Sequence, residues 1–258
     1  MMQNNNTTNR RDFIKLTTAS LGSAALFSGC SITGEQSKSK SSVISQNNTI
    51  LLQGDSITDS GRSRGQKQGF GGFGGNPLGN GYVNFVAALL TAKLPSYELN
   101  IQNRGISGNK VYDLDNRWDA DCLELKPDVL SILIGVNDIW HKLDGRYPEG
   151  TIEKYETDYR ALLNRTIKAM PNVKLVICEP FVLRCGSVND KWFPEFDGYR
   201  ASAQKMSQEF KAVFVPFQTM FDNAIKDTKP EYWAADGVHP TTAGAMLMAL
   251  EWIKAVGV

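Results

Sequence analysis

The chain has 258 residues, of which 41% are hydrophobic and 21% are charged, a composition typical of a soluble globular protein. Its 28 basic and 27 acidic residues leave a formal charge of +1, so charge does not indicate a nucleic-acid partner, and no base-stacking or zinc-finger pattern is present. The length suits one α/β domain of roughly 200 residues preceded by an N-terminal segment.

Residues 1–29 have the character of an export signal rather than of a folded segment. A polar start ends in Arg10-Arg11, and a short apolar run and small residues then lead to Cys30. The run is too short and too mixed for a comfortable membrane-spanning helix. It resembles a twin-arginine signal, and LFSGC resembles a bacterial lipobox with Phe27 where Leu is more usual. We expect lipidation at Cys30, with export without lipidation and an incidental tail as alternatives.

Residues 30–48 are rich in Ser, Lys, Gln and Asn and lack the apolar content to pack, so they predict a flexible tether. The expected protein is therefore exported and either periplasmic or on the cell surface. A lipid anchor at Cys30 would be its only membrane contact. The catalytic domain is expected to span residues 49–258.

From residue 49, short apolar runs alternate with helical patterns, which predicts a parallel sheet with helices on both faces. The run Val129–Ile134 is nearly continuous in apolar residues, as expected for a strand buried on both sides. The expected strands are Thr49–Gln53, Glu98–Gln102, Val129–Ile134, Lys174–Cys178 and Val213–Pro216. The expected helices are Tyr82–Leu94, Tyr112–Leu125, Thr151–Met170, Tyr199–Phe210 and Thr241–Val256.

The segment Gly69–Gly81 reads GFGGFGGNPLGNG and is the one strongly biased stretch of the domain. It lacks the Gly-Lys-Ser/Thr ending of a phosphate-binding loop and does not open a helix directly after a strand. We expect a pliable loop, anchored by Phe70 and Phe73, that is either plain surface or a wall of the site.

Three cysteines, Cys122, Cys178 and Cys185, lie in the expected domain, and no C-x-x-C pair occurs. Free, partly buried thiols are the favoured interpretation. A Cys178–Cys185 disulfide remains open, because an exported location would permit it.

Small polar residues follow the ends of the first three expected strands, and a fourth such stretch lies near the C-terminus. Because the carboxyl ends of parallel strands share one edge of a sheet, we expect these stretches to converge. They are Gly54–Ser56, Asn103–Gly105, Gly135–Asp138 and Asp236–Pro240.

The residues of these stretches suit nucleophilic attack on an ester. Ser56 needs a base to become a nucleophile, and His239 can supply it. Asp236 can accept the other imidazole N–H and fix the tautomer. The N–H groups of Ser56 and Gly105 and the amide of Asn137 could stabilise the oxyanion.

The four blocks GDSIT, NRGISG, GVND and DGVHP resemble, in order, those of the SGNH hydrolases, also called the GDSL esterase/lipase family. The resemblance implies a three-layer α/β/α, flavodoxin-like fold with a central parallel sheet of about five strands. It also implies a serine hydrolase that uses no metal or other cofactor, with the roles given above for Ser56, Asp236, His239, Gly105 and Asn137. Ile57 stands where the name-giving motif has Leu, a position expected to pack. The one G-x-S-x-G match, Gly61–Gly65, does not directly follow an expected strand as a nucleophile elbow would, which argues against an α/β-hydrolase.

Asp138, Trp140 and Trp233 are candidates for contacts with the substrate, whereas packing or capping explains each equally well. His141 has no obvious carboxylate partner by spacing and is expected at the surface or the rim of the site.

Exported bacterial hydrolases that resemble this chain are often polysaccharide deacetylases, and the sequence shows no long apolar lid. We therefore expect an esterase that removes acetyl groups from carbohydrate through an acyl-enzyme, with a small-molecule or polysaccharide ester as substrate. A lipase or lysophospholipase for longer acyl chains is the alternative, and so is a non-catalytic carbohydrate-binding lipoprotein. The sequence does not specify the oligomeric state.

Overall fold

The apolar runs predicted as strands form one parallel sheet in the computed structural model, which describes residues 42–64 and 75–258. The strand order is β2-β1-β3-β4-β5, and every neighbouring pair is parallel. The strands are β1 (Thr49–Gly54), β2 (Asn100–Asn103), β3 (Val129–Leu133), β4 (Lys174–Cys178) and β5 (Val213–Val215). All five residues of β3 are buried, as its continuous apolar run predicts.

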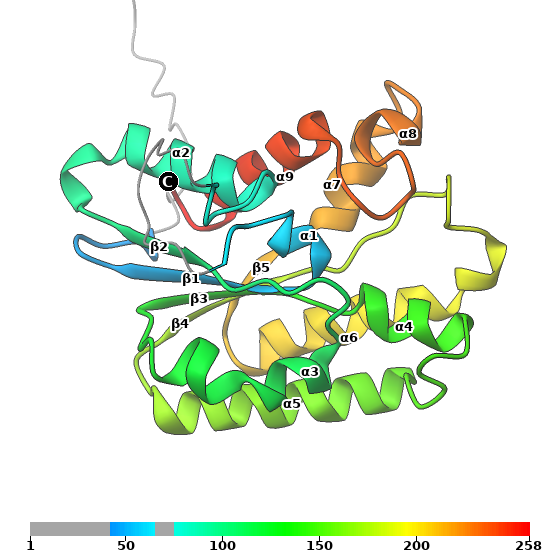
Figure 1. The fold of residues 1–258 in the computed structure, drawn as a ribbon, viewed down its shortest axis with the longest axis horizontal. Coiled ribbons are helices and arrows are strands. Elements are labelled where there is room, and N and C mark those ends of the chain that lie inside the picture. Colours follow the sequence, from blue (N-terminus) through cyan, green and yellow to red (C-terminus); the bar gives the residue numbers. More distant parts are fainter. Residues whose placement is uncertain (1–41, 65–74) are drawn as a thin grey trace, which may run out of the picture. The chain divides into compact units, whose positions relative to one another are not determined.

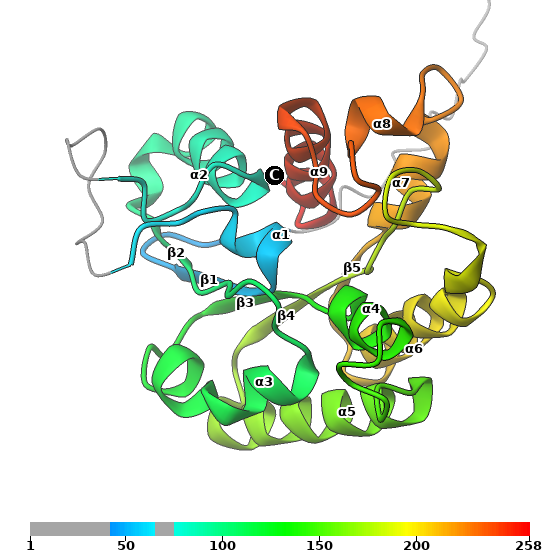
Figure 2. The same cartoon turned by 45° about the vertical axis from the view of Figure 1, so that its right-hand side comes forward.

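Helices cover both faces of the sheet (Figures 1 and 2). One face carries α2 (Tyr82–Lys93), α7 (Phe217–Ala224) and α9 (Thr242–Ala255), and the other carries α3 (Val111–Asn116), α5 (Ile152–Ala169) and α6 (Glu195–Glu209). The predicted three-layer α/β/α fold is therefore confirmed. Each layer buries apolar side chains against the strands, so the carboxyl edge of the sheet is held in place from both sides.

The helix expected over 112–125 is broken. It consists of α3, which ends at Asn116, and a π-helical turn, η2 (Asp119–Leu123). The break accompanies full burial of Trp118, whose indole N–H donates to Thr166 Oγ1 of α5 at 2.9 Å.

Six short elements were not expected. Three of them, α1, α4 and α7, directly follow strands at the carboxyl edge of the sheet. The six are α1 (Ser56–Asp59), η1 (Pro95–Tyr97), α4 (Val136–Leu143), η3 (Asp190–Trp192), α7 and α8 (Pro230–Trp233).

Residues 43–47, expected to belong to a flexible tether, instead contact the folded domain. Ile44 is buried in the core, the Val43 N–H donates to the Val256 carbonyl at 3.1 Å, and the Asn47 N–H donates to the Tyr97 carbonyl at 2.7 Å. The packed domain thus begins before β1, because one apolar pair in an otherwise polar stretch has a place to pack. The export signal, Cys30, Phe70 and Phe73 lie outside the described residues.

Cys122, Cys178 and Cys185 are free and buried, so no Cys178–Cys185 disulfide is present. Burial raises the pKa of the Cys178 thiol to about 12, which makes it a poor nucleophile. Within residues 42–64 and 75–258, none of the helices has the length and apolar content needed to cross a membrane.

Candidate active site

Ser56 is placed by the junction between β1 and α1, at the carboxyl edge of the sheet. Asp55 caps the short helix, because its Oδ1 accepts the Ile57 N–H at 3.0 Å. Ser56 is then the first residue of α1, where a backbone N–H has no acceptor within the helix. The sequence therefore directs both a hydroxyl and an unpaired N–H to the same point.

Ser56, His239 and Asp236 form one hydrogen-bonded chain. Ser56 Oγ lies 2.8 Å from His239 Nε2, and His239 Nδ1 lies 2.6 Å from Asp236 Oδ2. The loop between α8 and α9 delivers the pair, and the backbone N–H groups of Val238 and His239 donate to Asp236 Oδ1 at 2.9 and 2.7 Å. The three residues predicted from distant parts of the sequence are thus brought together.

The carboxylate of Asp236 is kept charged by these partners. Partial burial raises its pKa, but the hydrogen bonds from the His239 ring and from the two backbone N–H groups outweigh burial and leave the pKa below its ordinary value. A charged Asp236 accepts Nδ1–H, which leaves the lone pair of Nε2 facing the Ser56 hydroxyl. The arrangement can therefore take a proton from Ser56 and return it to a leaving group.

Asn137 lies in the first turn of α4, directly after β3, and is 5% exposed. Its Nδ2 donates to the Asn109 carbonyl at 3.2 Å, which leaves the second amide hydrogen free. One amide hydrogen of Asn137 is therefore available, and its role as an oxyanion donor stays a prediction.

Gly105 does not offer the donor that was expected of it. Its N–H already donates to Asn103 Oδ1 at 2.8 Å, and the residue is buried. A Cβ added there would lie 2.3 Å from the Asp59 N, so the glycine serves close packing of this loop against α1.

Gly108 was not predicted as an oxyanion donor, but its N–H, unlike that of Gly105, is free to donate. Its φ is +82°, a Cβ there would meet nothing within 4 Å, and its N–H has no acceptor within the described part of the chain. Asn137 Nδ2 donates to the carbonyl of Asn109, the residue after Gly108, so the turn that holds Gly108 contacts the Asn137 amide. The signal was the second glycine of NRGISG, in a turn closed by Asn109 N–H donating to the Ile106 carbonyl at 3.2 Å.

The side chain of Asp138 is not available to a substrate, because it is 3% exposed. Its Oδ1 accepts the Val111 N–H at 3.4 Å, and its Oδ2 has no partner. Burial raises the pKa of Asp138 to about 7, against the opposing effects of the Val111 N–H and the Lys110 charge. Burial also raises the pKa of Asp55 to about 7, so two buried carboxyl groups next in sequence to Ser56 and Asn137 each have one oxygen without a partner.

Of the predicted aromatic contacts, Trp140 lies beside the site and Trp233 packs against the core. The Trp140 ring is 6.3 Å from the His239 ring and 5.6 Å from Trp192. Trp233 contacts Tyr232 edge to face at 4.9 Å.

His141 is separate from the Ser56–His239–Asp236 chain. Its Nδ1 lies 3.5 Å from Lys110 Nζ, and burial together with the charges of Arg146 and Lys110 lowers its pKa.

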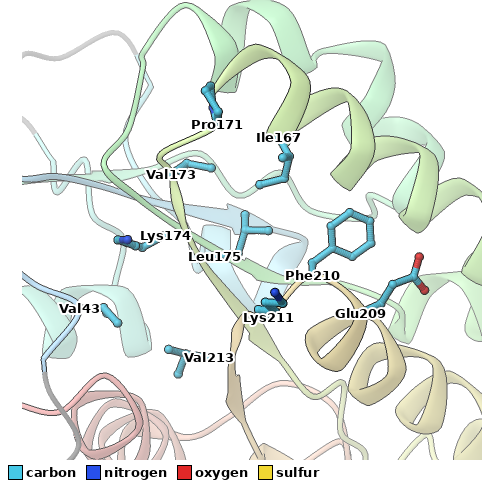
Figure 3. A pocket seen from close by; sticks show the side chains of 10 residues that line it. All are labelled: Val43, Ile167, Pro171, Val173, Lys174, Leu175, Glu209, Phe210, Lys211 and Val213. Atoms are coloured by element: carbon cyan, nitrogen blue, oxygen red, sulfur yellow. The ribbon is translucent and has the colours of Figure 1, made fainter.

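A cavity lies at each of the two edges of the sheet where the strands end or begin. A small cavity of about 110 Å³ adjoins Ser56 and His239 at the carboxyl edge. A larger one of about 520 Å³ lies at the opposite edge, where Lys174 begins β4 and Val213 begins β5 (Figure 3). Its lining residues include no serine, cysteine or histidine, whereas the smaller cavity adjoins the hydrogen-bonded pair Ser56 and His239.

Candidate metal ligands are scattered in the described ranges 42–64 and 75–258, where no group of three or more His, Cys, Asp or Glu side chains could hold a metal ion.

Comparison with known proteins gives a consistent result. The model of the GDSL-like lipase/acylhydrolase family matches residues 52–247. The acetylxylan esterase of Geobacillus stearothermophilus is 36% identical over 212 residues, which cover 81% of this chain and 93% of the esterase.

Solved structures show the same relationship. A protein of Parabacteroides merdae described as a GDSL-like lipase is 50% identical with a TM-score of 0.80, covering 84% of this chain and 99% of its own. The acetylxylan esterase Axe2 of G. stearothermophilus is 33% identical with a TM-score of 0.73, covering 84% and 97%. Substitutions of a serine, an aspartate and a histidine of Axe2 are each described as catalytic mutants.

Proposed function

Because this chain belongs to the GDSL-like lipase/acylhydrolase family, the SGNH hydrolases, and is thus a serine hydrolase of ester bonds, we propose that it removes acetyl groups from carbohydrate. Acetylated xylan and its oligosaccharides are the proposed substrates. The similarity to acetylxylan esterases over more than four fifths of the chain supports this substrate class.

One observation carries the proposal: the unbroken chain of short hydrogen bonds from Ser56 Oγ through the His239 ring to Asp236. A serine hydroxyl is a weak nucleophile until a neighbouring base takes its proton. In the proposed first step, Ser56 Oγ bonds to the ester carbonyl carbon while its proton moves to His239 Nε2. Asp236 stabilises the imidazolium that forms, and it stays ionised.

The tetrahedral intermediate then collapses. The bond from carbon to the sugar oxygen breaks, and His239 returns the proton to that oxygen, which releases the deacetylated sugar and leaves an acetyl ester on Ser56. A water molecule gives its proton to His239 and attacks the acetyl carbon, and collapse of the second intermediate releases acetate and restores Ser56.

The negative oxygen of both intermediates requires fixed donors. We assign this role to the N–H groups of Ser56 and Gly108 and to the free amide hydrogen of Asn137. The assignment is supported by the position of Asn137 beside the Gly108 turn and by the absence of any acceptor for either N–H within the described residues. Such preorganised donors typically contribute more to the rate than any other single effect.

Acetate release from acetylated xylo-oligosaccharides tests the proposal, with Ser56→Ala as the matched control. We expect release by the wild type and a loss of at least 1000-fold in the variant, whose smaller side chain should leave the fold intact. Ser56-dependent release of fatty acid from phospholipid, without release of acetate, would contradict the acetyl specificity. Retained binding of the oligosaccharide without turnover on any ester would favour a binding protein.

We further propose that the protein is exported and anchored by lipid at Cys30, on the sequence of its N-terminal segment alone. The expected result is that Cys30→Ser moves the protein from the membrane fraction to the soluble fraction of the producing bacterium. Unchanged fractionation would contradict the anchor.

A further inference from the structure

The cavity beside Ser56 and His239 measures about 110 Å³ and is lined by residues at or next to three helices. We infer that it receives the acyl group of the substrate and restricts that group to short chains, an inference that rests on the proposed esterase function. Its other walls come from the region of α1, the start of α2 and the region of α9: Ile57, Ser60, Gly81, Tyr82, Pro240 and Ala245.

The positions of the oxyanion donors decide which part of the substrate is left for the cavity. A carbonyl carbon bonded to Ser56 Oγ carries three further groups: the negative oxygen, the acyl chain and the leaving alcohol. The oxygen belongs with the donors, and neither Gly108 nor Asn137 lines the cavity. The cavity is therefore free for the acyl chain or for the alcohol.

Size separates these two alternatives. A dry protein cavity of about 150 Å³ holds one benzene molecule. A pyranose or furanose sugar carrying its hydroxyl groups and linked to further sugars does not fit in the smaller volume here, whereas a methyl or ethyl group does. The sugar then lies on the solvent side of His239, whose side chain is 44% exposed and has Trp140 as a neighbour.

The side chains that line the cavity have little freedom to move and make room for a longer acyl chain. Ile57, Tyr82 and Ala245 are 4%, 1% and 3% exposed. The Tyr82 hydroxyl is 3.3 Å from Thr58 Oγ1, and its ring meets Phe217 edge to face at 6.0 Å. Because packed interiors transmit small changes in volume, each added methylene should raise the barrier to acylation.

The chemistry of the walls agrees with an uncharged acyl group. Apart from His239, the lining contains no ionisable side chain other than the Tyr82 phenol, whose pKa burial raises well above its usual range. A charged acyl group would lose its hydration without gaining a partner.

The test is kcat/KM on p-nitrophenyl acetate, butyrate and hexanoate, with the Ser56→Ala rate subtracted. One methylene too many in a tight pocket typically costs about 10–200-fold, so we expect the wild type to prefer acetate over butyrate by at least about tenfold. Ile57→Ala removes part of one wall and should reduce this preference about tenfold. Ile57→Val makes a smaller change in the same direction and serves if the alanine variant does not fold.

Ala245→Val narrows the cavity and should lower activity on butyrate more than on acetate. Ala249→Val is the matched control, because it makes the same change one turn further along α9 at a buried position outside the cavity lining. An unchanged acetate-to-butyrate ratio in the Ile57 variants, with Ala245→Val and Ala249→Val alike, would overturn the cavity assignment and leave the esterase proposal standing. Absence of Ser56-dependent hydrolysis of every ester by the wild type would instead remove the proposed function, and the assignment with it.

Discussion

His239 and His141 are the two histidines of the chain, and their partners differ. His239 lies between a hydroxyl and a carboxylate, at 2.8 and 2.6 Å, which fixes its tautomer and stabilises its charged form during the reaction. His141 Nδ1 instead lies 3.5 Å from an ammonium group, Lys110 Nζ, and burial together with the charges of Arg146 and Lys110 disfavours a positive charge on the ring. Only His239 is therefore placed to act as a general base.

We expect His239→Ala to lower kcat by about 1000-fold or more and His141→Ala to leave most of the activity, because only the first removes the base. The measurement is kcat on p-nitrophenyl acetate for both variants. Circular dichroism should show that each is folded. An equal loss in two folded variants would contradict the assignment of the base.

Asn137 tests the oxyanion donors. Removal of one such donor typically costs about 100- to 1000-fold in kcat, because the donor matters most when charge has developed on the oxygen. We therefore expect Asn137→Ala to lower kcat by that factor with little change in KM. A change confined to KM would show instead that Asn137 only binds the ground state.

At the scale of elements, the strands were predictable because burial on both faces leaves a continuous apolar run, and β3 and β4 begin at the residues expected. The helices that directly follow strands were harder. α4 carries apolar residues at Val136, Ile139, Trp140 and Leu143, a helical spacing, but its Asn and Asp favour the interpretation as a turn.

The same limit applies to the site. The convergence of Ser56 and Asn137 follows from strand order and could be predicted, because parallel strands end at one edge. His239 reaches them from the loop between α8 and α9, which does not directly follow a strand. The sequence could not show which backbone N–H is free to stabilise the oxyanion. Gly105 and Gly108 are three residues apart in one block, and only the fold shows that Asn103 occupies the N–H of the first. The burial of Asp138 likewise depends on how α3 packs on α4, a long-range contact that no local pattern reports.

We expect the segment before β1, residues 42–48, to stabilise the domain. A protein beginning at residue 48 lacks buried Ile44 and the Val43–Val256 hydrogen bond that one beginning at residue 42 retains. Burial of one such side chain is worth about 2–3 kcal/mol, so we expect the shorter protein to melt about 5–10 °C lower.

Calorimetry of the two proteins measures the difference. In the protein that begins at residue 42, Ile44→Ala should reproduce much of the loss, whereas the exposed Ser45→Ala should not. Equal melting temperatures for the two lengths would show that the segment does not stabilise the domain.

In the whole molecule, two buried carboxyl groups next in sequence to site residues lower the free energy of unfolding once the pH is high enough to ionise them. Asp55 and Asp138 each have an oxygen without a partner, and burial raises the pKa of both to about 7 from an ordinary value of 3.8. The folded state therefore holds protons that the unfolded chain has lost. The contribution of each group to stability is complete below pH 4 and disappears as the pH rises through 7.

We expect Asp138→Asn to remove part of this pH dependence, because Asn keeps an acceptor for the Val111 N–H and does not ionise. The free energy of unfolding of the variant minus that of the wild type should increase by a few kcal/mol at most between about pH 4 and 7. Above pH 7 this difference should stay constant. Urea unfolding at pH 5 and pH 8 provides the measurement. Asp55 still titrates in the variant, so part of the pH dependence of stability should remain. Identical pH dependence in the two proteins would contradict the raised pKa of Asp138.

Whether Ser56 is the nucleophile of an ester hydrolase is tested by the mass of the enzyme quenched in acid during turnover of p-nitrophenyl acetate. We expect one added acetyl group on the peptide that contains Ser56, and neither the adduct nor turnover in Ser56→Ala. An acetyl group on another residue during turnover, or full turnover by Ser56→Ala, would contradict this role of Ser56.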